Sequence, residues 1–127
     1  MHAGEYGPEM RKLIESGLKQ TATAYVRANR ARLAFREEMT PILAAHDALL
    51  SPTAPAPAPD LSTTGDGSLC APWSYAGVPA ISLPSGQGAS GLPLAIQLVQ
   101  GPGASARLLG AAAWCESQLA FSKAPVL

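Results

Sequence analysis

The chain has 127 residues and a mass of 13.0 kDa, which is the size of one ordinary domain. Nine basic and nine acidic side chains give a formal net charge of zero, so no basic excess is available to neutralise phosphates and nucleic-acid binding is not expected. Residues 67–106 carry no charge, but five prolines and seven glycines interrupt them, so no apolar run is long enough to cross a membrane.

The first 46 residues predict helices. Pro8 suits the first turn of a helix over 8–17, because its missing N–H would have no partner there. A longer amphipathic helix begins at about Thr21 or Thr23, either of which can act as its N-cap.

An apolar stripe and a proline mark this longer helix. Pro41 should kink or restart it, and Thr40 could cap the continuation. The stripe predicted from the spacing consists of Tyr25, Ala28, Phe35, Met39 and Ile42.

From residue 47 onwards the pattern changes to short apolar runs and turns, which are typical of strands. The predicted elements are a buried strand at 48–50, a polyproline-like connector at 52–60, an irregular segment at 61–77, strands at 78–84 and 92–99, and a closing helix at 104–119. The two later strands are nearly continuous in apolar character, so we expect helices to cover both of their faces. This order indicates an α/β fold.

A Ser/Gly-rich segment at 85–91 admits two interpretations. It could present Ser85 or Ser90 as a nucleophile, or it could simply connect two strands. A G-x-S-x-G elbow is absent, a strand follows instead of a helix, and no histidine comes after His46 to serve as a base. We therefore interpret the segment as an exposed connection.

Two cysteines and two histidines offer little metal or redox chemistry. Cys70 and Cys115 lie in no C-x-x-C motif and are expected to be small buried side chains without a disulfide. His2 and His46 lack the spacing of zinc ligands, so we expect no metal site and no cofactor. The N-terminal stretch has no apolar signal region, which predicts a cytoplasmic protein.

Two further polar or aromatic positions can be interpreted from the elements that contain them. Gln97 lies within an apolar strand and should find an internal hydrogen-bond partner if it is buried. Trp114 lies on the closing helix and is expected to pack.

Three stretches in chain order carry a resemblance to a known family: DALLSPTAPAPAP, TGDGSLCAPWSYAGVPAISLPSG and GLPLAIQLVQGPGASARLLGAAAWCE. Together they resemble the C-terminal part of the amidase signature family, and the helical residues before them are similar to the approach to that region. The matching positions are Asp47, Pro52, Thr53, Gly77, Pro79, Ala80, Ile81, Ser82, Pro84, Gly86, Gly91, Leu92, Pro93, Gln97, Leu98 and Glu116.

The resemblance implies a fold and a division of the chain. It implies the C-terminal portion of the amidase signature fold, with mixed sheet strands flanked by helices. Residues 1–127 would form a single C-terminal segment, with 1–46 as the helical approach and 47–127 as the strands and closing helix.

The resemblance also implies a reaction. Members of the family cleave carboxylic amides through a serine acyl-enzyme, with a nucleophilic serine, a bridging serine and a lysine base in an upstream Gly/Ser-rich signature. No such signature occurs in this sequence, and its lysines stand in unrelated contexts; they are Lys12, Lys19 and Lys123. We therefore expect no catalytic residue here, and a partner in the N-terminal amidase portion, on the same or a separate chain.

Trp73 and Ser74 are the candidate substrate-binding residues. Trp73 could line an acyl pocket, or it could be a core or interface aromatic. Ser74 begins the triplet Ser-Tyr-Ala at a place where the family more often has an asparagine-containing triplet, which puts any substrate contact there in doubt.

Two functions from different classes follow. The chain could be the C-terminal segment of an amide hydrolase, inactive without the N-terminal portion. Alternatively, it could be a stand-alone structural or binding protein that dimerises over its uncharged segment. In either case we expect partners on that segment and a homo-oligomer.

Overall fold

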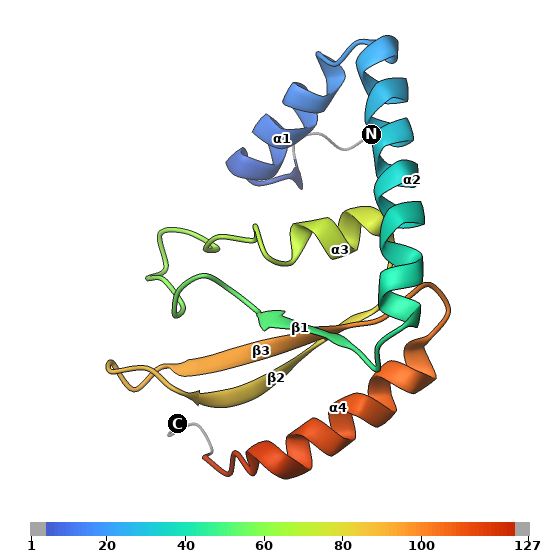
Figure 1. The fold of residues 1–127 in the computed structure, drawn as a ribbon. Helices are drawn as coiled ribbons and strands as arrows, with labels where there is room; N and C mark the ends of the chain where they lie inside the picture. The colour runs from blue at the N-terminus through green and yellow to red at the C-terminus, as the bar shows by residue number, and fades with distance from the viewer. Residues whose placement is uncertain (1–4, 124–127) are drawn as a thin grey trace. The chain divides into compact units, whose positions relative to one another are not determined.

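The computed structural model describes residues 5–123. In chain order its elements are α1 (Pro8–Leu18), α2 (Ala22–Ala44), β1 (Leu49–Pro52), α3 (Ala71–Ala76), β2 (Ala80–Gln87), β3 (Pro93–Val99) and α4 (Ser105–Leu119), as Figure 1 shows. The chain divides into two compact units between Ala34 and Phe35, inside α2. The boundary expected at residue 46 stays a prediction.

The first unit contains α1 and the beginning of α2, and both helices start as the sequence predicts. Pro8 occupies the first turn of α1, where its lack of an N–H leaves no hydrogen bond unmade. Thr21 caps α2, because its Oγ1 accepts a hydrogen bond from the backbone N–H of Ala24 at 3.1 Å.

The end of α2 differs from the prediction. The helix continues through Pro41 to Ala44, so the proline does not end it. Thr40 does not cap a second helix, since its hydroxyl donates instead to the carbonyl of Arg36 at 2.7 Å, one turn earlier. Along α2 the buried side chain is Leu43, which lies outside the predicted stripe, whereas Ile42 is exposed.

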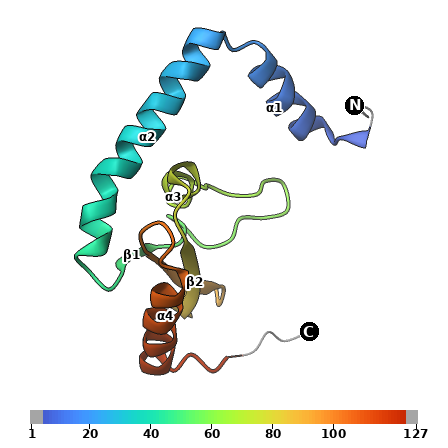
Figure 2. The same ribbon diagram turned by 90° about the vertical axis from the view of Figure 1, so that its right-hand side faces the viewer.

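The second unit is built on a three-stranded sheet with the order β1-β3-β2. Both pairings are antiparallel, with Leu98 opposite Leu50 on one side and Ile81 on the other. Figures 1 and 2 show α4 along one side of the strands and α3 on the opposite side. The α/β class predicted from the sequence is confirmed.

The core of this unit lies between the sheet and α4. Leu83 and Leu98 from the strands meet Leu108 and Ala112 from the helix, and all four are buried. Leu108, Ala112, Cys115 and Leu119 form the face that the closing helix was predicted to bury. Trp114 falls outside that face and is 66% exposed. The prediction that Trp114 packs is therefore wrong for the described part of the chain.

The strand limits also differ from those expected. β1 spans Leu49–Pro52 rather than 48–50, and β2 runs to Gln87 through an irregularity between Pro84 and Gly86. Ser85 therefore lies within a strand, and the connection is a tight turn in which Gly91 has a φ of 79°. Pairing with β3 extends β2 beyond the residue at which the local composition predicts that the strand ends.

Candidate functional site

The two faces of the sheet differ in chemistry because successive side chains of a strand point to opposite faces. Leu98 and its neighbours across the strands point toward α4. One residue earlier along β3, Gln97 lies opposite Ser51 of β1 and Ser82 of β2, which places three polar side chains in a row across the other face.

Gln97 anchors this polar row. It is 3% exposed, and its Nε2 donates to Ser51 Oγ at 3.1 Å, to the Pro52 carbonyl at 3.2 Å and to the Leu69 carbonyl at 2.8 Å. The internal partners predicted for this glutamine are confirmed. The bonds tie the segment before α3 to the sheet, because Leu69 lies outside any strand.

A short helix places Trp73 and Ser74 above this face. Residues 71–76 were predicted to be irregular and instead form α3, with a proline in the first turn and Gly77 at the C-cap. Gly77 has a φ of 67° and donates its N–H to the carbonyls of Ser74 and Trp73, so it ends the helix in a left-handed conformation that favours glycine. The proline before the aromatic and the glycine after it were the sequence signals for this helix.

Trp73 is half-buried and contacts the aromatic ring of Phe35, with ring centroids 6.3 Å apart and planes tilted by 36°. Its indole Nε1 is buried and has no hydrogen-bond partner within residues 5–123. A buried N–H without an acceptor costs about 1–3 kcal/mol, so this group lowers the stability of the described fold by that order.

Trp73 and Ser74 line a cavity of about 350 Å³ together with Gln97 of the polar row. Thr53 and Ser82 also contribute, and their hydroxyl oxygens lie 2.8 Å apart. The lining residues are Thr53, Cys70, Trp73, Ser74, Val78, Ala80, Ile81, Ser82 and Gln97. No aspartate, glutamate, lysine, arginine or histidine is among them, so the cavity suits an uncharged group.

Of these lining residues, the sequence predicted only Trp73 and Ser74 to bind substrate. Thr53 and Ser82 matched positions of the family, but no binding role was predicted for them. A period of two along the strands would have placed Ser51, Ser82 and Gln97 on one face, but only once the register was known. The thiol of Cys70, which is half-buried and free, donates to the Thr53 carbonyl at 3.1 Å.

In the Ser/Gly-rich segment the side chain of Gln87, rather than a serine, accepts a hydrogen bond from Lys123 Nζ. Ser85 Oγ donates to the Leu94 carbonyl at 3.4 Å, which is a contact within the sheet. In the described residues, the serines that contact a carboxylate are in local turns: Ser62 bonds Asp60, and Ser68 bonds Asp66. This geometry gives no support to a nucleophile at Ser85, and the connection between the strands is confined to residues 88–92 rather than 85–91.

These turns hold two exposed carboxylates in their charged form. The hydroxyl of Ser62 lowers the pKa of Asp60 from its usual value, and the backbone N–H of Ser68 lowers the pKa of Asp66. Asp66 lies at a larger hollow of about 600 Å³, lined chiefly by the Ala/Pro connector.

The described part of the chain offers neither a metal cluster nor a membrane span. No group of three histidine, cysteine, aspartate or glutamate side chains within residues 5–123 is arranged to hold a metal ion. No helix in this range is long and apolar enough to cross a membrane.

The family model named Amidase matches residues 2–109. The chain belongs to the amidase family. This membership confirms the resemblance inferred from the three motif stretches.

Individual relatives agree with the family assignment. This amidase-family chain is 35% identical over 108 residues to the protein named "Putative amidase AmiD" of Mycobacterium tuberculosis, covering 76% of this chain and 23% of the relative. It is 32% identical to a subunit of the glutamyl-tRNA(Gln) amidotransferase of Exiguobacterium sibiricum, covering 74% of this chain and 22% of the relative. It therefore spans about a quarter of the length of these proteins.

Solved structures give the same result. A crystal structure described as an amidase superposes with a TM-score of 0.77 at 32% identity, covering 92% of this chain and 30% of that one. The corresponding glutamyl-tRNA(Gln) amidotransferase subunit of Thermotoga maritima superposes with a TM-score of 0.53 at 28% identity, covering 82% and 26%.

Proposed function

We propose that this chain is the C-terminal segment of an enzyme that hydrolyses carboxylic amides, and that it supplies one wall of the substrate pocket. The observation that carries the proposal is the cavity at Trp73 and Ser74, in a chain that belongs to the amidase family. The nucleophilic serine, bridging serine and lysine base come from the N-terminal amidase portion.

The reaction follows the route that the family resemblance implies. The nucleophilic serine attacks the amide carbonyl, the amine leaves with a proton delivered through the lysine and bridging serine, and water then releases the acid from the acyl-serine. Trp73 and Ser74 contact the acyl group of the substrate. An acyl group without charge is favoured, because a charged group would be desolvated with no opposite charge in this cavity.

Mixing two polypeptides tests this function. The first is this chain, and the second is the crystallised amidase from which the segment matching this chain has been removed, called the truncated amidase below. Neither should hydrolyse a carboxylic anilide alone, because one lacks the catalytic serines and the other lacks a pocket wall. The mixture should release aniline, measured by absorbance under steady-state conditions.

Two results would contradict the proposal. One is a mixture that stays as inactive as its parts. The other is turnover by this chain alone that is lost in the Ser82→Ala, Ser85→Ala or Ser90→Ala variant, which would place the nucleophile here.

A further inference from the structure

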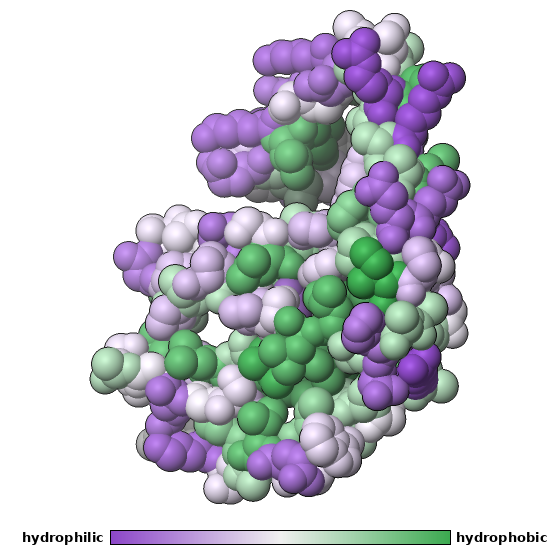
Figure 3. Space-filling view, viewed as in Figure 1, coloured by the Kyte–Doolittle hydropathy of each residue, from purple (hydrophilic) through white to green (hydrophobic). Residues whose placement is uncertain are grey.

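The hollow between the Ala/Pro connector and the sheet, called the connector hollow below, continues the cavity at Trp73 along the same face. Ala95 precedes Gln97 by two residues on β3, so both side chains point to that face of the strand. Ala95 lines the connector hollow and Gln97 lines the cavity, while Thr53 lines both. The hollow has a volume of about 600 Å³, and Figure 3 shows the surface open between the connector and the strands. A ligand longer than the cavity can therefore extend from it into the connector hollow.

The side chains that line the connector hollow are apolar apart from three hydroxyl groups and one carboxylate. Proline rings and alanine methyl groups of the connector form one wall, and the beginning of β3 forms another. The hydroxyl groups belong to Thr53, Thr64 and Ser85, and the carboxylate belongs to Asp66. In the described chain no lysine, arginine or histidine is among the lining residues. An apolar hollow with one negative charge suits a ligand that joins an apolar body to a positive charge.

The carboxylate of Asp66 is held in place, and none of the ion pairs within residues 5–123 involves it. Its Oδ1 accepts a hydrogen bond from the backbone N–H of Ser68 at 2.8 Å. This bond lowers the pKa of Asp66, so the group stays charged. Gly65 brings the turn close to the connector, since its φ is 84° and an added Cβ would lie 3.4 Å from Pro59 Cδ. The remaining lone pairs of the carboxylate can accept hydrogen bonds from a ligand.

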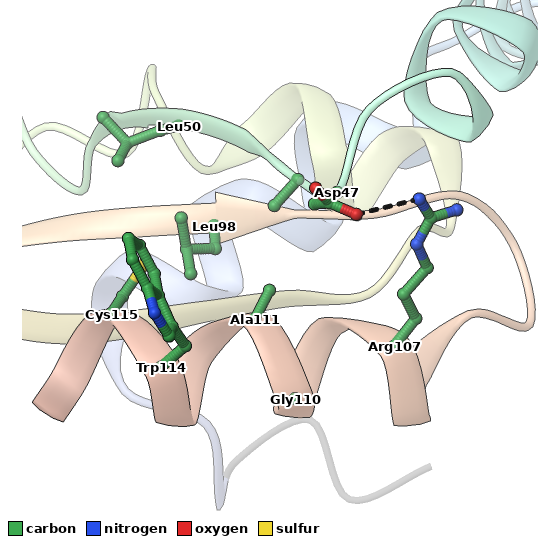
Figure 4. Close-up of a pocket in the computed structure, with 9 residues that line it drawn as sticks. Asp47, Leu50, Leu98, Arg107, Gly110, Ala111, Trp114 and Cys115 are labelled. Carbon is green, nitrogen blue, oxygen red and sulfur yellow. Dashed lines mark hydrogen bonds and ion pairs between the residues drawn. The ribbon is translucent and has the colours of Figure 1, made fainter.

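The groove on the other face of the sheet, between β1 and α4, differs in its electrostatics. There Asp47 Oδ1 already pairs with Arg107 Nη2 of α4 at 3.1 Å, as Figure 4 shows. Both residues line that groove, so its carboxylate has a cation from its own chain. Asp66 has no such partner in the described residues, which leaves its charge available to a ligand.

We propose that the connector hollow binds the amine half of the substrate and selects amines that carry a second, protonated amino group. The inference rests on the proposed function, which places the acyl group in the cavity at Trp73. The amine half then lies beyond Thr53, with its apolar body against the connector and its ammonium group beside Asp66. Substrates of this class are monoacylated diamines, and their hydrolysis by water gives the acid and the free diamine.

Two anilides that differ in one group test this selectivity. The para-aminomethyl anilide of butyric acid carries an ammonium group, and the para-hydroxymethyl anilide carries a neutral hydroxyl at the same place. With the mixture of this chain and the truncated amidase, kcat/KM should be about two- to fivefold higher for the ammonium substrate, as expected for an ion pair open to water. The difference should lie in KM, because Asp66 contacts a group away from the reacting carbonyl. Chromatography of the released anilines measures both rates.

A matched pair of substitutions assigns the selectivity to one carboxylate. Asp66→Asn removes the charge but keeps an acceptor for the Ser68 N–H, so the ratio of the two kcat/KM values should fall by about the same two- to fivefold. Asp60→Asn is the control, because Asp60 likewise accepts a hydrogen bond from the N–H of Ser62, at 2.9 Å, but does not line the connector hollow. The control should keep the ratio of the unmodified chain.

Binding at Asp66 can also be measured without hydrolysis, by nuclear magnetic resonance of this chain labelled with ¹⁵N. The ligand is para-methylbenzylamine, which is protonated at neutral pH, and the neutral control is para-methylbenzyl alcohol. The amine should shift the amide signal of Ser68, because this N–H is bonded to the carboxylate that the ammonium group contacts. The alcohol at the same concentration should shift it less, and the response to the amine should vanish in the Asp66→Asn variant.

Two results would overturn the inference: equal selectivity ratios for the Asp66→Asn and Asp60→Asn mixtures, or equal shifts of the Ser68 signal with the amine and the alcohol. Hydrolysis of both anilides with a ratio that Asp66→Asn leaves unchanged would remove this selectivity and leave the proposed function standing. Hydrolysis of neither anilide, with the Ser68 signal shifted by the amine alone, would establish Asp66 as a cation site and remove the proposed function.

Discussion

Replacing Leu98 with alanine should lower the free energy of unfolding by about 2–5 kcal/mol. Leu98 is 2% exposed and lies at the centre of the core, between Leu83 of β2 and the buried side chains of α4. Removing its branched end leaves a cavity that strands on both sides cannot close without breaking their hydrogen bonds. Urea unfolding followed by circular dichroism would measure the change.

The strand register offers a matched control. Leu50 is the residue of β1 directly opposite Leu98, but its side chain is 58% exposed. Leu50→Ala should cost less than about 0.5 kcal/mol in the isolated chain. If the two variants unfold at the same urea concentration, the core does not lie between the sheet and α4.

Replacing Gln100 with glutamate should lower the free energy of unfolding by about 3 kcal/mol. Gln100 is 1% exposed, and its Nε2 donates to the carbonyls of His46 at 2.9 Å and Asp47 at 2.8 Å. Its Oε1 accepts from the N–H of Gly101 at 2.6 Å. The substitution keeps the shape but turns the donor into a carboxylate oxygen that faces two carbonyls.

Gln118→Glu is the control, because Gln118 is an exposed glutamine on α4. It should change the free energy of unfolding by less than about 0.5 kcal/mol. Equal unfolding midpoints for the two glutamate variants would mean that Gln100 does not fasten the end of α2 and the start of β1 to the sheet.

The sequence predicts best the parts that depend on one element's own periodicity. The buried face of α4 follows from a spacing of three and four residues, since Leu108, Ala112 and Cys115 share a face of any helix. The N-cap at Thr21 likewise depends on residues within one turn. Family membership could also be inferred, because the order and spacing of the motifs are in the sequence itself.

The parts that were missed depend on residues far apart in the chain. Gln100 looks like an ordinary polar residue after a strand, and its role arises from carbonyls more than fifty residues earlier. Trp114 was expected to pack, but its side chain is 66% exposed in the described part of the chain. The polar row at Gln97 requires the register of three strands, and α3 is too short for its periodicity to show.

The most direct measurement of the central claim is the position of the acyl group after one turnover. The mixture of this chain and the truncated amidase would be acid-quenched within milliseconds of adding a p-nitrophenyl ester, and both polypeptides weighed by intact mass spectrometry. We predict the added acyl mass on the truncated amidase and none on this chain. An acyl group on Ser82, Ser85 or Ser90 of this chain would contradict the account.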